Sequence, residues 1–168
     1  MPRLFRPHHA ATRPLLPALL AIVTGMGTAW AQGGPVILAQ HPGTEPDRQA
    51  RVLMSRALHD AAAHGEHPVL LTGSAQLSTD PRRTALFAQV QSESLCGSAG
   101  CTTSVYLPDG HGWKLVLDSV SGPVTITPQT HGEMHDLLVD GTDRWIWNGE
   151  TYTDTQAAAS PPSGDAAP

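Results

Sequence analysis

Short runs of apolar and β-branched residues follow one another closely from residue 69 onward, and their spacing is the strongest constraint on the fold. Turn signals separate the runs, among them Pro108-Asp109-Gly110 and Asn148-Gly149, which are typical of hairpins. Parallel strands need crossovers of about a dozen residues or more, and the gaps are too short for them. The sequence therefore predicts a twisted antiparallel β-sheet with meander connections. The expected strands are residues 69–72, 84–91, 102–107, 113–118, 123–127, 137–139, 144–147 and 151–153.

One helix is expected before the strands. Thr44 is suited to an N-cap, and Pro46 belongs in the first turn, where its missing N–H costs nothing. Gly65 and Pro68 mark the end. Between them apolar residues recur at spacings of three and four, which predicts a single amphipathic helix of about 18–20 residues packed on the sheet. The expected class is α+β. The apolar positions are Ala50, Leu53, Met54, Ala57, Leu58 and Ala61.

The first 31 residues have the features of a secretory signal peptide. Arg3, Arg6 and Arg13 precede an apolar run, and Ala29-Trp30-Ala31 matches the small-x-small cleavage pattern. The run is shorter than the roughly 20 residues that cross a bilayer, so no stable membrane insertion is expected after cleavage following Ala31. We expect a periplasmic or secreted protein, although a retained membrane anchor is the alternative. The predicted organisation is a signal peptide at 1–31, a flexible lead-in that docks locally at 32–43, one α+β domain at 44–154 and a disordered tail at 155–168.

The two cysteines, Cys96 and Cys101, are expected to form a disulfide in an exported protein. They enclose a loop between two predicted strands, and its glycines allow the backbone to bend sharply. Two interpretations stay open: a structural staple for a small domain, or a rigid contact surface for a partner. The residues of the loop are Gly97, Ser98, Ala99 and Gly100.

The charge distribution restricts the partners. The 168-residue chain has 10 Lys and Arg against 15 Asp and Glu, and 7 basic residues remain once the three leader arginines are set aside. From Thr84 onward only Lys114 and Arg144 oppose ten acids. Such an acidic surface does not fit nucleic acid, whose binding needs a basic patch. It fits a basic protein or an envelope component, and it also fits the simpler role of keeping a secreted domain soluble.

No catalytic signature is present, so no enzyme activity and no cofactor are expected. A nucleophile elbow, a phosphate-binding loop and a dinucleotide fingerprint are all missing. His131, Glu133 and His135 suggest a metal-dependent hydrolase only remotely, because the order H-x-E-x-H differs from H-E-x-x-H. Acids such as Asp136 and Asp140 are expected to be solvated turn residues. The tryptophans, including Trp145 and Trp147 on one strand face, are expected to serve in packing.

Residues 84–153 resemble a family of small exported bacterial proteins of uncharacterised function. The matching motifs are C-G-S-A-G-C at 96–101, G-W-K-L-V at 112–116, H-G-x-x-x-D-L-L-V at 131–139 and W-x-W-x-G-x-x-Y at 145–152. His131 stands where that family usually has Asn, and one extra residue separates Gly132 from Asp136. This resemblance implies export and fold, but no activity.

The chain is also similar, more weakly, to Ivy-type periplasmic inhibitors of C-type lysozyme. That family places a C-x-x-x-x-C loop between antiparallel strands after a helix, and the loop plugs the lysozyme cleft. Here the loop has no charged or imidazole side chain, and His111 of the next hairpin is the candidate to supply one. The primary prediction is a non-catalytic exported domain that binds a protein or envelope component. Lysozyme inhibition is the alternative.

Overall fold

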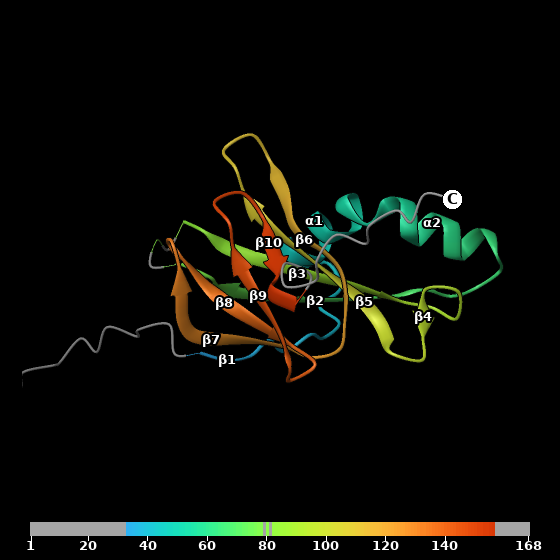
Figure 1. Cartoon of the computed structure of the whole chain (residues 1–168). Helices are drawn as coiled ribbons and strands as arrows, with labels where there is room; N and C mark the ends of the chain where they lie inside the picture. Colours follow the sequence, from blue (N-terminus) through green and yellow to red (C-terminus); the bar gives the residue numbers. More distant parts are fainter. Residues whose placement is uncertain (1–32, 79, 81, 157–168) are drawn as a thin grey trace, which may run out of the picture.

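The computed structural model describes residues 33–78, 80 and 82–156. Two antiparallel sheets face each other, and two short helices lie on the outer side of one sheet (Figure 1). The α+β class and the antiparallel pairing are confirmed. The helices are α1 (Glu45–Leu53) and α2 (Ser55–Ala63). The strands are β1 (Gly34–Pro35), β2 (Val69–Gln76), β3 (Thr84–Gln91), β4 (Cys96–Gly97), β5 (Gly100–Pro108), β6 (Trp113–Ser121), β7 (Val124–His131), β8 (Met134–Val139), β9 (Asp143–Trp147) and β10 (Tyr152–Asp154).

The predicted single helix is wrong, because the helical segment is divided at Met54. Thr44 caps α1 as expected, its hydroxyl accepting a hydrogen bond from the Asp47 amide at 3.4 Å. At Met54 the backbone leaves helical geometry (φ −96°, ψ 14°), and α2 starts at the next residue. Neither proline nor glycine lies there, and the apolar spacing continues through the break. Met54 packs against the core under the helices, and its sulfur accepts a hydrogen bond from the Tyr106 hydroxyl at 3.2 Å. A periodicity argument does not include such contacts.

The expected meander is present, but it is divided between two sheets. The first sheet has the order β2-β3-β5-β6, with the short β4 paired to the start of β5. The second has the order β1-β7-β8-β9-β10. The chain passes from one to the other at Gly122-Pro123. Gly122 has φ 104°, and a Cβ there would lie 2.9 Å from the Cβ of Asp140, so only glycine fits this connection.

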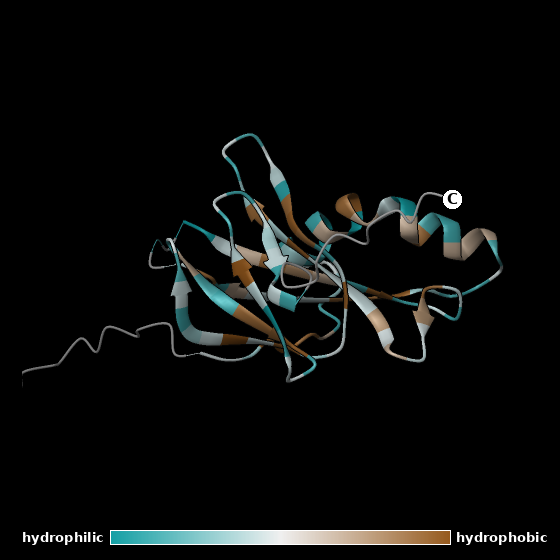
Figure 2. Cartoon of the chain, in the orientation of Figure 1, coloured by the Kyte–Doolittle hydropathy of each residue, from teal (hydrophilic) through white to brown (hydrophobic). Residues whose placement is uncertain are grey.

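The alternation of side chains on β3 gives the molecule two cores. Phe87 is fully buried between the two sheets, together with residues such as Val105 and Leu137. Its neighbours Leu86 and Ala88 point the other way and pack under the helices. Figure 2 shows the matching alternation of apolar and polar residues along the helices and strands. The first sheet is thus buried on both faces over much of its area.

Residues 34–39, which we call the linking segment, contact both sheets. Gly34 and Pro35 pair with β7, and the Val36 amide donates to the Val124 carbonyl at 2.8 Å. Ala39 then exchanges two hydrogen bonds with Thr72 on β2, at 3.1 and 2.9 Å. The expected lead-in therefore includes a segment that joins the open sides of the two sheets.

Neither described helix is long and apolar enough to cross a membrane. The predicted signal peptide and cleavage site lie outside the described residues, as does most of the predicted tail.

Candidate binding groove

The predicted Cys96–Cys101 disulfide is confirmed, and it closes the end of a hairpin. Cys96 pairs directly with Cys101, and their Cα atoms are 4.1 Å apart. We call residues 96–101 the disulfide tip. Its four central residues are exposed, and Gly100 has φ 98°, a conformation suited to glycine at the turn. In Figure 1 the tip extends beyond the second sheet, at the end marked β4.

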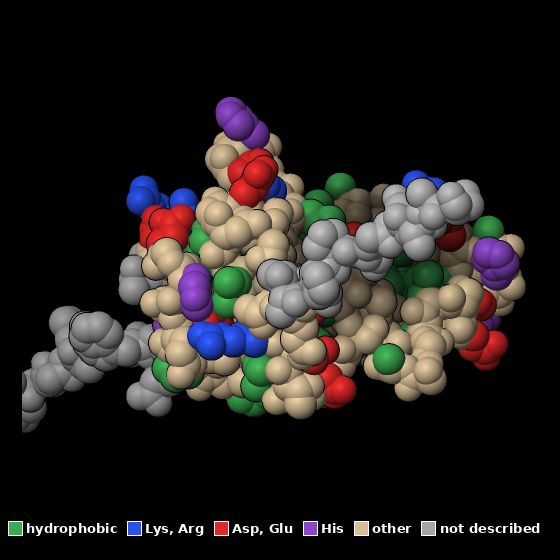
Figure 3. Space-filling view, in the orientation of Figure 1, with side chains coloured by type: hydrophobic (Ala, Val, Ile, Leu, Met, Phe, Trp, Pro, Cys, Tyr) green, Lys and Arg blue, Asp and Glu red, His purple; other side chains and the backbone are tan. Residues whose placement is uncertain are grey.

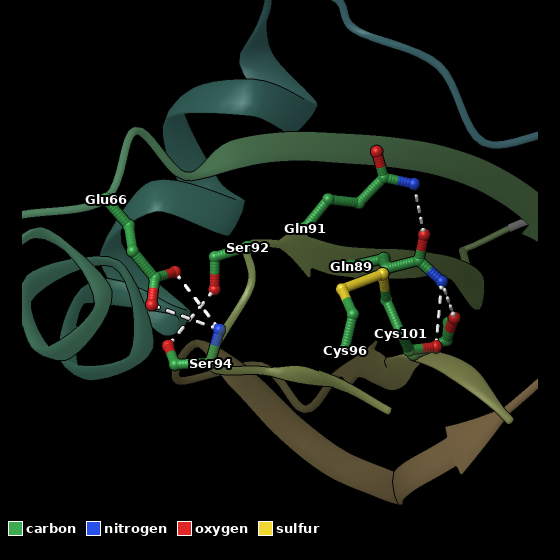
Figure 4. Close-up of a disulfide and its surroundings, with 8 residues drawn as sticks. Glu66, Gln89, Gln91, Ser92, Ser94, Cys96 and Cys101 are labelled. Atoms are coloured by element: carbon green, nitrogen blue, oxygen red, sulfur yellow. Dashed lines mark hydrogen bonds between the residues drawn. A yellow bond between two sulfur atoms is a disulfide. The ribbon is translucent and has the colours of Figure 1, made fainter. Parts of the chain in front are cut away.

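Two side chains anchor the disulfide tip from outside (Figure 4). The Glu66 carboxylate, just after α2, accepts hydrogen bonds from the Ser94 amide at 3.0 and 3.2 Å. On β3, the Gln89 amide group donates to the Cys101 carbonyl at 3.2 Å and to the Thr103 hydroxyl at 3.0 Å. The chain that enters the tip is therefore held at Ser94 by the segment after α2, and the tip itself is held to the sheet at Cys101.

The electrostatics of Glu66 agree with this anchoring role. Partial burial raises the pKa of Glu66, whereas hydrogen bonds from the Ser94 amide and from the Ser94 and Ser92 hydroxyls lower it. The net effect places the pKa of Glu66 below its ordinary value. The carboxylate form that holds the Ser94 amide is thus favoured.

A groove of about 530 Å³ runs between the disulfide tip and the turns that connect the two sheets. We call it the tip groove. Apolar side chains from β2, β3 and the linking segment form one part, and polar side chains of β3 and β5 form another. Gly122 and Asp140 lie at the far side. The lining residues are Val36, Leu38, Leu71, Phe87, Gln89, Gln91, Ala99, Gly100, Cys101, Thr103, Gly122, Pro123, Val124 and Asp140.

Hydrogen-bonded amides cross the tip groove in a row. Gln91 donates from its Nε2 to the Oε1 of Gln89 at 3.0 Å, and Gln89 in turn donates to Thr103 and to the main chain of Cys101. Figure 4 shows this row beside the disulfide. Both N–H groups of the Gln89 amide are used, so its orientation is fixed.

Ion pairing leaves the described surface with an excess of acids. Every Lys and Arg between residues 33 and 156 pairs with one acid. The pairs are Arg48–Glu45, Arg51–Asp47, Arg56–Asp60, Arg82–Asp80, Arg83–Glu133, Lys114–Glu150 and Arg144–Asp136. The described acids without a Lys or Arg partner in that range are Glu66, Glu93, Asp109, Asp118, Asp140, Asp143 and Asp154. In Figure 3 the lower right of the molecule carries Asp and Glu without Lys or Arg.

The structure does not bring His111 to the disulfide tip. His111 lies in the β5–β6 turn, where its amide and that of Gly112 donate to the Asp109 carboxylate at 2.9 and 2.8 Å. Cys101 is near the start of β5, and this turn follows the end of the same strand. The candidate contact set of the sequence analysis therefore divides into two separate places.

His131, Glu133 and His135 take different partners. His131 Nδ1 bonds to the Asp136 carboxylate at 2.7 Å, Glu133 pairs with Arg83, and the His135 side chain is buried. Across the described residues, no group of three His, Cys, Asp or Glu side chains is placed to hold a metal ion.

Asp136 was expected to be a solvated turn residue, and this prediction is wrong. Its side chain is fully buried on β8, and Arg144 Nε donates to it at 3.0 Å from β9. The half-exposed His131 and Arg144 side chains cover it. The strand was expected to begin at Leu137, whereas β8 begins at Met134, so Asp136 lies inside the strand and not in the turn before it.

Trp145 and Trp147 pack at the margin of the core between the sheets, in agreement with the packing role expected for them. The ring of Trp147 meets Tyr152 edge-on, with centroids 5.4 Å apart. The Tyr152 hydroxyl donates to the His135 carbonyl at 2.8 Å, and burial raises the pKa of Tyr152. These aromatics stabilise the second sheet and do not line the tip groove.

Sequence reasoning found the disulfide tip but missed the groove beside it. Gln89, Gln91 and Thr103 belong to strands β3 and β5, and they face the groove because the second sheet stops short of them.

Comparison of the chain with protein-family models, with curated protein sequences and with solved structures finds no match. The resemblances suggested by its motifs stay predictions.

Proposed function

We propose that this protein is exported and binds a cationic segment of a partner protein in the tip groove. The observation that carries the proposal is the position of the disulfide tip: Ala99 and Gly100 form one side of the groove, fixed by the disulfide and by Glu66 and Gln89. A side that is already ordered lowers the entropy cost of binding.

The charge of the groove supports a cationic partner. Asp140 lines it without a Lys or Arg partner among the described residues, and none of the lining residues is Lys or Arg. Opposite charge favours encounter and selects against anionic competitors. The lining combines one carboxylate, neutral amide groups and apolar side chains. Such a lining fits a polypeptide with basic side chains.

A titration followed by NMR tests the proposal. The ¹⁵N-labelled protein is mixed with a short oligolysine peptide and, in parallel, with oligoglutamate of equal length. We expect oligolysine to shift the amide signals of Ala99, Gly100 and Asp140, with smaller shifts at high salt because screening weakens the attraction. Equal shifts with both peptides, or shifts confined to residues outside the groove, would contradict the proposal.

Matched variants locate the charge that matters. Asp140→Asn should weaken oligolysine binding about two- to fivefold, the effect of one exposed ion pair. Asp118→Asn removes an acid beside the helices that likewise has no Lys or Arg partner among the described residues, and it should leave oligolysine binding unchanged. Equal losses in both variants would mean that net charge alone, and not the groove, attracts the peptide.

Export is supported by the disulfide, because such bonds persist in oxidising compartments. Cell fractionation followed by thiol alkylation tests it. We expect the processed chain outside the cytoplasm with neither cysteine alkylated unless a reductant is added. Intact precursor in the cytoplasm with two reactive thiols would overturn this part of the proposal.

Inhibition of a lysozyme-type cell-wall hydrolase is the second candidate. The projecting tip and the acidic surface favour it, since a rigid acidic protein suits a basic enzyme with an open cleft. Micromolar protein should then slow cell-wall lysis by a C-type lysozyme at low salt. Unchanged lysis rates would eliminate this candidate and leave peptide capture in place.

A further inference from the structure

We infer that the tip groove recognises the main chain of an extended peptide through the carboxamide of Gln91. This inference rests on the proposed function, and it names the form of the partner: a strand-like segment that alternates apolar and cationic side chains. The inference depends on three features that lie along one groove: the Gln91 amide, which has hydrogen-bonding groups left over, an apolar surface, and the Asp140 carboxylate, which has no Lys or Arg partner among the described residues.

Gln91 is the member of the amide row with bonding capacity left over. One of its two N–H groups donates to Gln89, and no other hydrogen bond to its side chain is present among the described residues. Gln89, by contrast, uses both N–H groups and its carbonyl. Gln91 therefore offers one N–H donor and one carbonyl acceptor side by side. A peptide unit offers the complementary C=O and N–H.

The remaining lining suits the side chains of such a segment. In an extended chain successive side chains point to opposite sides. One set would lie against Leu71 and the linking-segment residues Val36 and Leu38, all partly exposed. A basic side chain near the other end would reach Asp140, whose backbone amide donates a hydrogen bond to the Pro123 carbonyl at 2.9 Å.

A carbohydrate fits this groove less well. Sugar rings are commonly bound by stacking on aromatic faces, and the single aromatic residue in the lining, Phe87, is fully buried. The aromatics with exposed area, such as Trp147, lie elsewhere. The lining therefore favours a peptide over a glycan.

Backbone methylation tests the inference directly. Binding of an alternating valine–lysine peptide is measured by calorimetry, together with a copy that carries N-methyl groups on alternate amides. We expect the unmethylated peptide to bind about fivefold more tightly, the factor of one hydrogen bond. In Gln91→Ala this preference should vanish, because the acceptor that reads the N–H is gone. Gln49→Ala on α1 is the control and should keep it.

A second measurement protects the test against misfolding. The amide NMR spectrum of Gln91→Ala should match that of the wild-type protein outside the tip groove, so that a lost preference reports on Gln91 and not on the fold. Tight binding of both peptides by the wild-type protein would overturn main-chain recognition while leaving charge-driven capture standing. If neither peptide binds, the inference and the proposed function both fail. If the preference survives in Gln91→Ala, another residue reads the main chain and the assignment to Gln91 is wrong.

Discussion

At the scale of single residues, Asp136 is a buried charge of the second sheet that depends on its two partners. Its carboxylate is fully buried, and it neutralises Arg144 and receives the His131 ring from two neighbouring strands. Burying a charge is costly unless partners compensate it, so the three side chains depend on one another. Their role is to hold β7, β8 and β9 in register.

Asp136→Asn should lower the free energy of unfolding by about 3 kcal/mol, the lower end for breaking a buried ion pair, because Arg144 and His131 retain access to water. Urea unfolding measures it. Glu150→Gln is the control: it breaks the exposed pair with Lys114 and should cost less than about 1 kcal/mol. Similar costs for both variants would contradict the buried-charge account.

Gly122 is the second residue whose replacement should be costly. Gly122→Ala imposes both a left-handed conformation on alanine and a 2.9 Å contact with Asp140. Gly110→Ala has a similar φ of 87° but open space around the new Cβ. We expect about 1 kcal/mol for Gly110→Ala and clearly more for Gly122→Ala, measured by thermal unfolding. The Gly122 variant should also disturb the amide signals of the tip groove, whereas the Gly110 variant should not.

At the scale of elements, the disulfide tip is a hairpin end whose position depends on Glu66. Because the pKa of Glu66 is lowered in the folded protein, the anchoring contribution is fully present above the ordinary pKa of that carboxyl group. It is lost as the pH falls through the lowered value. Acidification should therefore release the chain at Ser94, while the Gln89 hydrogen bond to the Cys101 carbonyl keeps the other side of the tip in place.

Hydrogen exchange at the Ser94 amide measures this release. Glu66→Ala should raise the exchange rate of Ser94 at neutral pH relative to neighbouring amides, and the wild-type protein should approach the variant as the pH drops below the carboxyl range. Glu93→Ala removes the adjacent exposed acid and should change neither. An unchanged Ser94 rate in Glu66→Ala would refute the anchoring role.

The covalent closure of the tip is expected to add little to global stability. A ring this small gives about 2 kcal/mol in the loop-closure estimate. The double variant Cys96→Ser, Cys101→Ser should therefore still fold, with a free energy of unfolding lower by about that amount in urea. Its tip should lose order, and oligolysine binding should weaken. Unaltered binding would mean that the disulfide is only a staple.

Local sequence signals predicted most of the strands correctly. They failed where contacts between distant residues determine the structure. The strand β3 was expected at its observed bounds, because its ends are marked by turn residues and its interior is apolar. The break at Met54 has no local signal, because neither proline nor glycine lies there. The groove was not predictable either, because Gln91 looks like any polar strand residue until the end of the second sheet is known.

At the scale of the whole molecule, the division of one meander into two sheets creates the candidate site. The second sheet covers only part of the first, and the end of β3 together with the start of β5 becomes the floor of the tip groove. The acidic surplus could be counted from composition. The location of that surplus could not be predicted from composition. It depends on which acid each described Lys and Arg pairs with, and so on which carboxylates remain without a basic partner.

The linking segment also has a consequence for the order of assembly. Gly34, near the beginning of the described chain, pairs with Ile126, and this pairing cannot form until most of the polypeptide has been synthesised. Contacts between such distant positions form late, because the chain must first lose the entropy of a large loop. Until β7 is formed, Gly34 and Pro35 therefore have no strand to pair with, and this part of the linking segment stays open to other proteins.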